Sequence, residues 1–121
     1  MKKLYLLILS LSLLISVEFC RAQINLSNNY QGEPFEYKLY QNYPNPFNPT
    51  TIISYSLPQN SFVSLRVYNS LGNEVAVLVN KNKPAGNYDV LFDGKNLSSG
   101  IYYFQLKAND FIKVKKMILL K

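Results

Sequence analysis

The feature that most constrains the fold of this 121-residue chain is a series of short segments in which apolar and polar residues alternate. Successive side chains of a β-strand point to opposite faces, so this period of two predicts strands buried on one face. Turn-forming residues separate the segments at short, regular intervals. The segments are 53–57, 63–68, 74–79, 88–92, 101–106 and 111–120, with a shorter seventh around 38–40. The pattern predicts an all-β fold, an Ig-like or fibronectin-like antiparallel β-sandwich of about seven strands.

Three segments carry more detailed expectations. Residues 81–87 contain Pro84 and Gly86 and are predicted to form a loop. Segment 101–106 is apolar at nearly every position, which is typical of a strand covered on both faces or lying at an edge under a loop. In segment 111–120, one face is predicted to be buried and to be interrupted by Lys116. Its members are Ile112, Val114, Ile118 and Leu120.

The N-terminus has the pattern of a secretory signal peptide. A basic head at 1–3 precedes an apolar run at 4–17, and Cys20 and Ala22 supply small residues before a cleavage site. We expect residues 1–22 to be removed by cleavage between Ala22 and Gln23. The run is shorter than the roughly 20 apolar residues of a transmembrane helix.

An alternative interpretation makes Cys20 the acylated residue of a lipoprotein. The charged Glu18 and the bulky Phe19 stand where that processing prefers small residues, which disfavours it. Residues 23–36 are polar and lack periodicity, so they are interpreted as a flexible lead-in. The predicted Ig-like domain then covers 37–121.

Composition excludes several kinds of chemistry from the mature chain. The sequence has no His, and its one Cys lies in the predicted leader. The usual thiol nucleophile, disulfide, histidine base and Cys/His zinc site are therefore absent, and neither enzymatic activity nor a cofactor is expected. Asp89, Asp93 and Asp110 suggest a calcium or acid/base hypothesis. Residues 93–96 contain only a fragment of a calcium loop, however, so turn formation is favoured.

The net charge of +6 comes from 13 basic and 7 acidic residues. A nucleic-acid binder gathers its positive charge with exposed aromatic residues on one groove or helix. Here the lysines are dispersed except for Lys113, Lys115 and Lys116, which are more typical of the solvated face of a strand. No nucleic-acid partner is predicted.

The densest motif is the segment 41–49, QNYPNPFNP. It contains three asparagines (Asn42, Asn45, Asn48), two aromatic residues (Tyr43, Phe47) and three prolines (Pro44, Pro46, Pro49). Prolines cannot donate to a strand ladder, so the segment cannot be an interior strand. We expect the asparagines to bond to nearby backbone and the aromatic residues to anchor the segment on the sandwich. A proline-rich connector and a polyproline-type ligand are the two interpretations from physics alone.

Together with later motifs, this segment resembles a known family. The opening QNYPNPFNPTT and IISYSLP, followed by 67–75, 84–86, 97–103 and 115–121, is similar to the type A C-terminal sorting domain of cargo proteins of the type IX secretion system. The resemblance covers 37–121. It implies an Ig-like sandwich related to the flagellar hook-capping protein, in agreement with the strand pattern.

The resemblance implies a Gram-negative protein that is exported through the periplasm to the cell surface or the medium. Its implied partners are an outer-membrane translocon and a cell-surface sortase, with possible attachment to lipopolysaccharide after cleavage. The hypothetical sorting motif is Asn42, Tyr43, Pro44, Asn45, Pro46, Phe47, Asn48, Pro49, Gly100, Lys115, Lys116, Met117 and Lys121. Members of this family normally carry a large passenger before the domain. The short 23–36 segment therefore suggests a minimal cargo, a gene remnant or a lost passenger.

Two functional alternatives remain. The lysine-rich tail 113–121 is either a solvated edge that discourages strand pairing or a strand that a receptor reads by strand addition; the resemblance favours recognition. The rival to a sorting domain is a small exported Ig-like binding or adhesion module. Its aromatic surface would use Tyr68, Tyr102 and Tyr103, which are equally compatible with core or tyrosine-corner packing.

Overall fold

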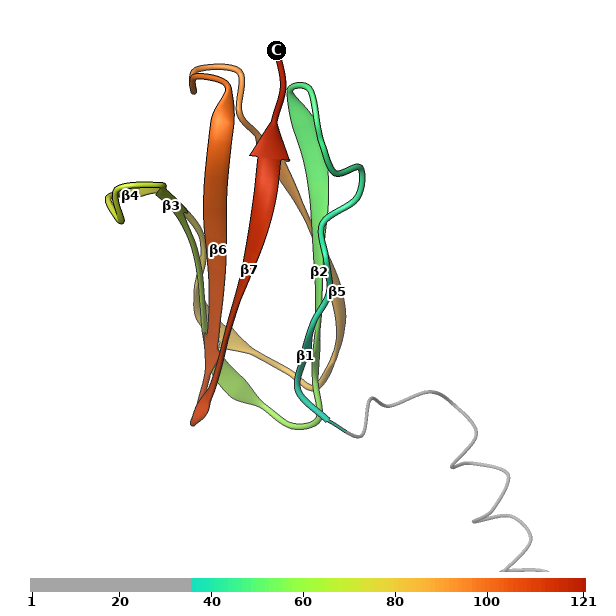
Figure 1. Cartoon of the computed structure of the whole chain (residues 1–121). Coiled ribbons are helices and arrows are strands. Elements are labelled where there is room, and N and C mark those ends of the chain that lie inside the picture. The colour runs from blue at the N-terminus through green and yellow to red at the C-terminus, as the bar shows by residue number, and fades with distance from the viewer. Residues whose placement is uncertain (1–35) are drawn as a thin grey trace, which may run out of the picture. The chain divides into compact units, whose positions relative to one another are not determined.

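In a computed structural model, which describes residues 36–121, the chain forms seven β-strands in two sheets (Figure 1). The strands are β1 (Lys38–Leu39), β2 (Thr50–Leu57), β3 (Ser61–Asn69), β4 (Glu74–Lys83), β5 (Gly86–Asp93), β6 (Gly100–Ala108) and β7 (Phe111–Leu119). One sheet has the order β1-β2-β5 and the other β4-β3-β6-β7, and all neighbouring strands are antiparallel. The predicted antiparallel β-sandwich is confirmed.

The core lies between the two sheets and is built from alternate residues of the strands. Each central strand turns one set of side chains inward and the other to the outer face, as the period of two requires. The inward apolar side chains of β2, β3 and β6 are all at most 5% exposed. They are Ile53, Tyr55 and Leu57; Val63, Leu65 and Val67; and Tyr102, Phe104, Leu106 and Ala108.

The predicted loop at 81–87 is wrong. Strand β4 continues to Lys83 and β5 begins at Gly86, so only Pro84 and Ala85 connect them. The polar residues at the end of β4 pair with β3, for instance Lys81 with Val63. Backbone hydrogen bonds do not require apolar side chains, and an edge strand keeps its polar residues in water. The turn residues Pro84 and Gly86 therefore mark a shorter connection than the loop predicted from them.

Strand β6 differs from the expectation of a strand covered on both faces or lying at an edge. It is an inner strand between β3 and β7. Its outward residues Ile101 and Tyr103 remain 42% and 37% exposed. The sandwich has only two layers, so the second sheet covers one face of β6 and leaves the other open.

The predicted face of the C-terminal strand is also wrong. Strand β7 pairs with β6 so that Met117 lies opposite the buried Tyr102. Directly opposed residues of antiparallel strands share a face, so the odd-numbered residues of β7 point inward. Met117 and Leu119 are fully buried. The predicted residues instead lie on the outer face or beyond the strand: Ile112, Val114 and Leu120 are about half exposed and Ile118 is half-buried.

Turns were predicted between the alternating segments, and two of them are confirmed by their backbone geometry. Between β3 and β4, the side-chain oxygen of Asn69 accepts hydrogen bonds from the amides of Leu71 and Asn73, both at 3.0 Å. Gly72 in that turn has φ 86°, a conformation that glycine adopts without steric cost. The two-residue hairpin between β6 and β7 places Asn109 at φ 52°. Within 36–121, no helix is long and apolar enough to cross a membrane.

Candidate functional site at the C-terminal strand

The proline-rich segment 41–49 joins the two sheets along one side of the sandwich. We call this side, where the segment meets β7, the seam. Tyr43 pairs with Ile52 of β2 through two backbone hydrogen bonds of 3.0 Å. Four residues later, Phe47 lies parallel to Leu119 in an isolated bridge with β7. The segment therefore leaves the edge of one sheet and attaches to the edge of the other (Figure 1).

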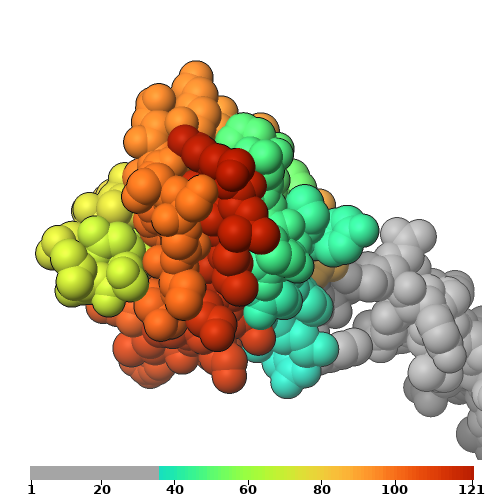
Figure 2. Space-filling view, turned by 45° about the horizontal axis from the view of Figure 1, so that its top comes forward, coloured from blue at the N-terminus to red at the C-terminus, as the bar shows by residue number. Residues whose placement is uncertain are grey.

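This segment satisfies successive polar groups on the outer edge of β7. The amide of Phe47 donates to the carbonyl of Ile118 at 2.9 Å, and the amide of Leu120 donates to the carbonyl of Phe47 at 3.0 Å. The amide of Ile118 donates to Asn45 Oδ1 at 3.0 Å. Gln41 Nε2 donates to the carbonyl of Lys116 at 2.7 Å. In Figure 2 the last residues, in dark red, accordingly lie between β6 and the green segment that precedes and begins β2.

Phe47 anchors the segment in the core. Its side chain is 1% exposed and meets Phe92 edge-on, with ring centroids 5.9 Å apart. A Cβ on Gly94 would lie 3.1 Å from Leu119 Cδ2 and 3.4 Å from the Phe47 ring. The absence of a side chain at Gly94 therefore allows the segment and β7 to approach each other. Sequence reasoning treated Gly94 only as a turn residue, because its close neighbours are distant in sequence.

A buried polar cluster fixes the beginning of the segment. Asn42 is 2% exposed, and its Nδ2 donates to the carbonyl of Pro44 at 3.1 Å and to Thr51 Oγ1 at 3.0 Å. Thr51 Oγ1 donates in turn to the same carbonyl at 2.8 Å. Buried polar groups are stable when they are hydrogen-bonded to one another, so this cluster holds one conformation of the turn. The sequence indicated the role of Asn42 but not that of Thr51, whose signal was its place two residues after the last proline, Pro49.

Other expectations about the segment need correction. Tyr43 is 81% exposed, so it does not anchor the segment. Asn45 bonds to the distant strand β7 rather than to nearby backbone. Asn48 is exposed, and its side chain has no hydrogen bond within residues 36–121. Pro44 and Pro46 are exposed and Pro49 is half-buried, with its carbonyl accepting the amide of Gly94 at 2.8 Å.

The C-terminal members of the predicted motif divide into packing and surface residues. Met117 is a core residue. Lys115 points to the inner side at the seam and is half-buried, whereas Lys116 is exposed on the outer face. Lys121 is tied to the loop before β6, because its amide donates to Ser99 Oγ at 3.0 Å and its Nζ donates to the carbonyl of Lys95.

Gly100 begins β6 opposite Leu119 and has φ 155°, which side chains rarely adopt. The structure therefore brings the proline segment, the end of β7 and the start of β6 together at one end of the domain.

The tyrosines proposed for an adhesive surface have different surroundings. Tyr102 is 5% exposed and its hydroxyl donates to the carbonyl of Ser98 at 2.7 Å, which is corner packing. Tyr68 and Tyr103 lie side by side on the outer face of the four-stranded sheet. The carboxylate of Asp93 accepts the amide of Lys95 at 2.9 Å and so shapes a turn. Among residues 36–121, no three Asp, Glu, His or Cys side chains form a group that could hold a metal ion.

Positive charge is concentrated in one of the two sheets. The β1-β2-β5 sheet carries one lysine, Lys38, and two acids, Asp89 and Asp93. The β4-β3-β6-β7 sheet carries a single acid, Glu74, which forms an ion pair of 2.6 Å with Arg66. Its basic residues are Arg66, Lys81, Lys83, Lys107, Lys113, Lys115 and Lys116. The C-terminal strand therefore belongs to the more basic of the two sheets.

Comparison with known families identifies the domain. The family model of the secretion system C-terminal sorting domain matches residues 41–120. The chain belongs to this family. The match begins at Gln41, whose side chain reaches the carbonyl of Lys116, and it ends at Leu120, whose amide bonds to Phe47. The two ends of the sorting domain thus meet at the seam. No curated protein and no solved structure matches the chain.

The family match confirms the resemblance to the type IX sorting domain seen in the sequence. A sorting domain of this kind directs export to the cell surface or the medium and interacts with the secretion machinery. The family is not a catalytic one, in agreement with the composition. The alternative of an adhesion module receives no support from the comparison.

Proposed function

We propose that this domain is the sorting signal that the outer-membrane translocon of the type IX system recognises, and that the translocon binds it at the seam. The observation that supports this most directly is the contact between the two ends of the matched region, where Gln41 bonds to β7. A receptor at the seam would contact the proline-rich motif and the lysine-rich strand at once. It would also meet a folded domain, because the seam exists only when both sheets are packed.

The export route is expected to begin at the N-terminal leader. Residues 1–35, which include the predicted signal peptide 1–22 and most of the lead-in 23–36, lie outside the described residues. Mass spectrometry of the exported protein should find Gln23 at the N-terminus, because small residues at Cys20 and Ala22 precede that bond. An N-terminus at Met1, or an acylated Cys20, would contradict the cleavage.

After transit through the periplasm, the proposed partners are the translocon and then the cell-surface sortase. Removal of the domain would leave the preceding segment free for attachment to lipopolysaccharide. The role of the domain itself is non-enzymatic: it delivers whatever precedes Tyr37. This part of the proposal rests on membership of the family.

A charge reversal on β7 tests the function. A periplasmic reporter fused ahead of Tyr37 should reach the cell surface or medium in a host with this secretion system. Lys115→Glu combined with Lys116→Glu should leave the folded fusion in the periplasm, because reversed charge opposes docking through the lysines of β7. The matched control is Lys81→Glu with Lys107→Glu, which makes the same charge change on exposed residues of the same sheet and should be exported.

Three outcomes would contradict the proposal. If the unaltered fusion stays in the periplasm, the domain is not sufficient to direct export. If both double variants are exported, the translocon does not recognise the lysines of β7. If both are retained although folded, net charge rather than the seam determines export.

A further inference from the structure

The edge of β7 is closed only along its C-terminal half. The even-numbered residues of β7 point their backbone groups away from β6, as the bonds of Ile118 to the proline segment show. The ladder between β6 and β7 has no register shift, so the same direction holds for Ile112 and Val114. Within residues 36–121, no hydrogen bond involves the outer amides and carbonyls of these two residues or the amide of Lys116. Five backbone groups of one edge are therefore open.

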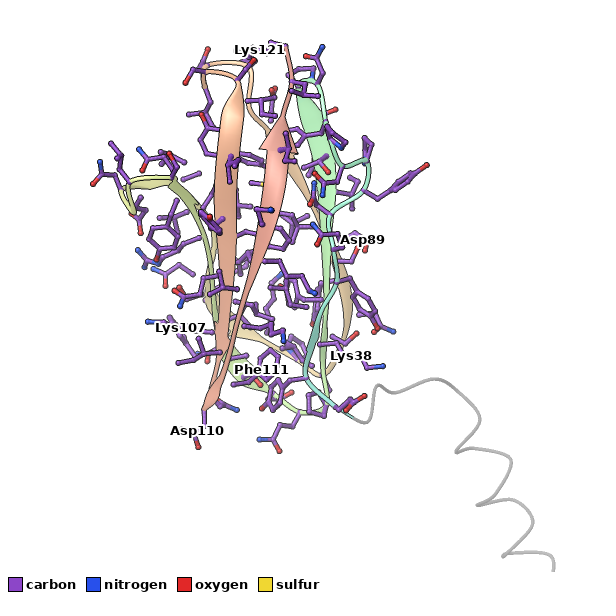
Figure 3. All side chains as sticks on the ribbon, in the orientation of Figure 1. Lys38, Asp89, Lys107, Asp110, Phe111 and Lys121 are labelled. Atoms are coloured by element: carbon purple, nitrogen blue, oxygen red, sulfur yellow. The ribbon has the colours of Figure 1, made fainter. Side chains whose placement is uncertain are left out.

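A hollow lies beside this open edge. It has a volume of about 230 Å³. Residues of β1 and its flanks line one side, and β7 contributes Phe111 and Lys113. Phe111 stacks on Tyr37 with ring centroids 5.4 Å apart, and both residues line the hollow. Figure 3 shows Lys38 and Phe111 toward the same end of the domain as the hairpin residue Asp110.

The side chains around the open edge determine which side chains an added strand must carry to bind there. On the inner side, Lys113 and Lys115 border the seam, and neither has an ion-pair partner among residues 36–121. On the outer side, Ile112 and Val114 are 57% and 48% exposed. A strand that continues the sheet would place acidic residues beside the lysines and apolar residues beside Ile112 and Val114, in alternation.

The same lysines exclude a second copy of this strand. If two β7 edges paired around a two-fold axis, the lysines of one copy would lie near those of the other. Like charges at opposed positions destabilise a pair of strands. The edge is therefore protected from self-association and remains selective for a partner of opposite charge.

We propose that residues 112–116 of β7 bind an extended segment of a partner protein in which acidic and apolar residues alternate, by addition of that segment to the sheet. This inference rests on the proposed function and deepens it, because it names the part of β7 that the proline segment leaves available to the secretion machinery. Backbone hydrogen bonds supply affinity in this mode of recognition, and alternate side chains supply specificity.

Titration of the purified chain with a blocked heptapeptide of alternating Glu and Val tests the inference. Amide NMR shifts should change at Ile112, Val114 and Lys116, and not along the opposite edge strand β4. A control peptide with Lys in place of Glu should bind at least about tenfold more weakly. Binding of the Glu peptide should weaken as salt is raised, because charge pairs at an open edge are screened.

Two variants separate backbone pairing from charge. Val114→Pro removes an outward amide without removing a bond to β6, and should weaken binding at least about tenfold, whereas the matched Val114→Thr keeps the amide and should bind normally. Lys113→Glu with Lys115→Glu should reverse the preference toward the Lys peptide. This double variant decides the question if the proline variant does not fold.

The inference is overturned if the Glu peptide does not bind, if shift changes map to β4 or β5, or if charge reversal leaves the preference unchanged. Export of the unaltered reporter fusion distinguishes this failure from failure of the proposed function. Export without peptide binding would reject the open edge and leave the sorting function standing. Peptide binding without export would reject the sorting function alone.

Discussion

The hydroxyl of Tyr55 is the buried side-chain polar atom that lacks a hydrogen-bond partner among residues 36–121. Tyr55 is 1% exposed, and its ring stacks on Tyr88 with centroids 5.2 Å apart. Burial, with a smaller contribution from the neighbouring Tyr88, raises the pKa of Tyr55 to about 12. A buried hydroxyl without a partner costs roughly 1–3 kcal/mol of desolvation that nothing recovers.

Replacement of Tyr55 by Phe should therefore not destabilise the domain at neutral pH. The variant removes the orphan hydroxyl and keeps the ring, so the free energy of unfolding should be unchanged or higher by up to about 1–3 kcal/mol. Urea unfolding at pH 7 measures this. Leu65→Ala is the control for a damaged core and should cost about 2–5 kcal/mol. A loss of more than about 1 kcal/mol in the Phe variant would show that the hydroxyl is satisfied.

The same residue makes a prediction about alkaline pH. Because the pKa of Tyr55 is higher in the folded state (about 12) than in the unfolded chain (about 10), the folded state favours the protonated hydroxyl. Ionisation of this group leaves the free energy of unfolding unchanged below about pH 10 and lowers it as the pH rises toward about 12, because the unfolded chain loses the proton first. The stability difference between the native protein and Tyr55→Phe should shift in favour of the variant across that range.

At the scale of elements, the segment 41–49 acts as a connecting strand that pairs with β2 at one end and β7 at the other. Of its two aromatic rings, only Phe47 is inserted into the core, while Tyr43 extends into solvent. The Phe47 ring packs against Phe92 in the core. Its removal would therefore leave a cavity beneath the backbone hydrogen bonds of the seam. The apolar anchoring of this element is therefore concentrated at Phe47, while the buried Asn42 holds its beginning through hydrogen bonds.

A matched pair of alanine variants tests this anchoring. Phe47→Ala should lower the free energy of unfolding by about 3–5 kcal/mol, because it empties a fully packed core position. Tyr43→Ala should change it by no more than about 0.5 kcal/mol, since the ring is exposed. Thermal or urea unfolding followed by circular dichroism measures both. Similar losses from the two variants would mean that the whole segment, rather than Phe47, holds the seam.

At the scale of the whole molecule, the C-terminal strand belongs to the core as well as to the candidate recognition surface. Met117 and Leu119 are fully buried between the sheets, and Leu119 also contacts the space left by Gly94. A small domain of this size has little stability in reserve. The end of the chain therefore cannot be removed as if it were a detachable signal.

Truncation after Lys116 should abolish cooperative unfolding. The deletion removes Met117 and Leu119, each worth about 2–5 kcal/mol as a buried side chain, together with the bridge to Phe47. Deletion of Lys121 alone is the control, and it should cost about 1 kcal/mol or less because the residue is exposed. Circular dichroism melts compare the two. A truncated chain that melts cooperatively would show that these residues serve recognition only.

The sequence by itself determined the fold class and the turns. Alternation in segments such as 53–57 and 63–68 reports which side chains avoid water, and asparagine and glycine in 69–73 report a tight reversal. The ordered motifs also carried the family. These features are local, because each depends on side chains and backbone angles within a few residues.

Only the tertiary structure decided how distant segments meet. Pairing with β6 inverted the predicted face of β7, because the register is set by the partner strand as well as by the apolar residues of β7 itself. The seam required Phe47, Gly94 and Leu119 to meet, although they are far apart in the chain. Closure of half the β7 edge, and the open backbone groups at 112–116, likewise follow from contacts between segments. No local pattern records such contacts.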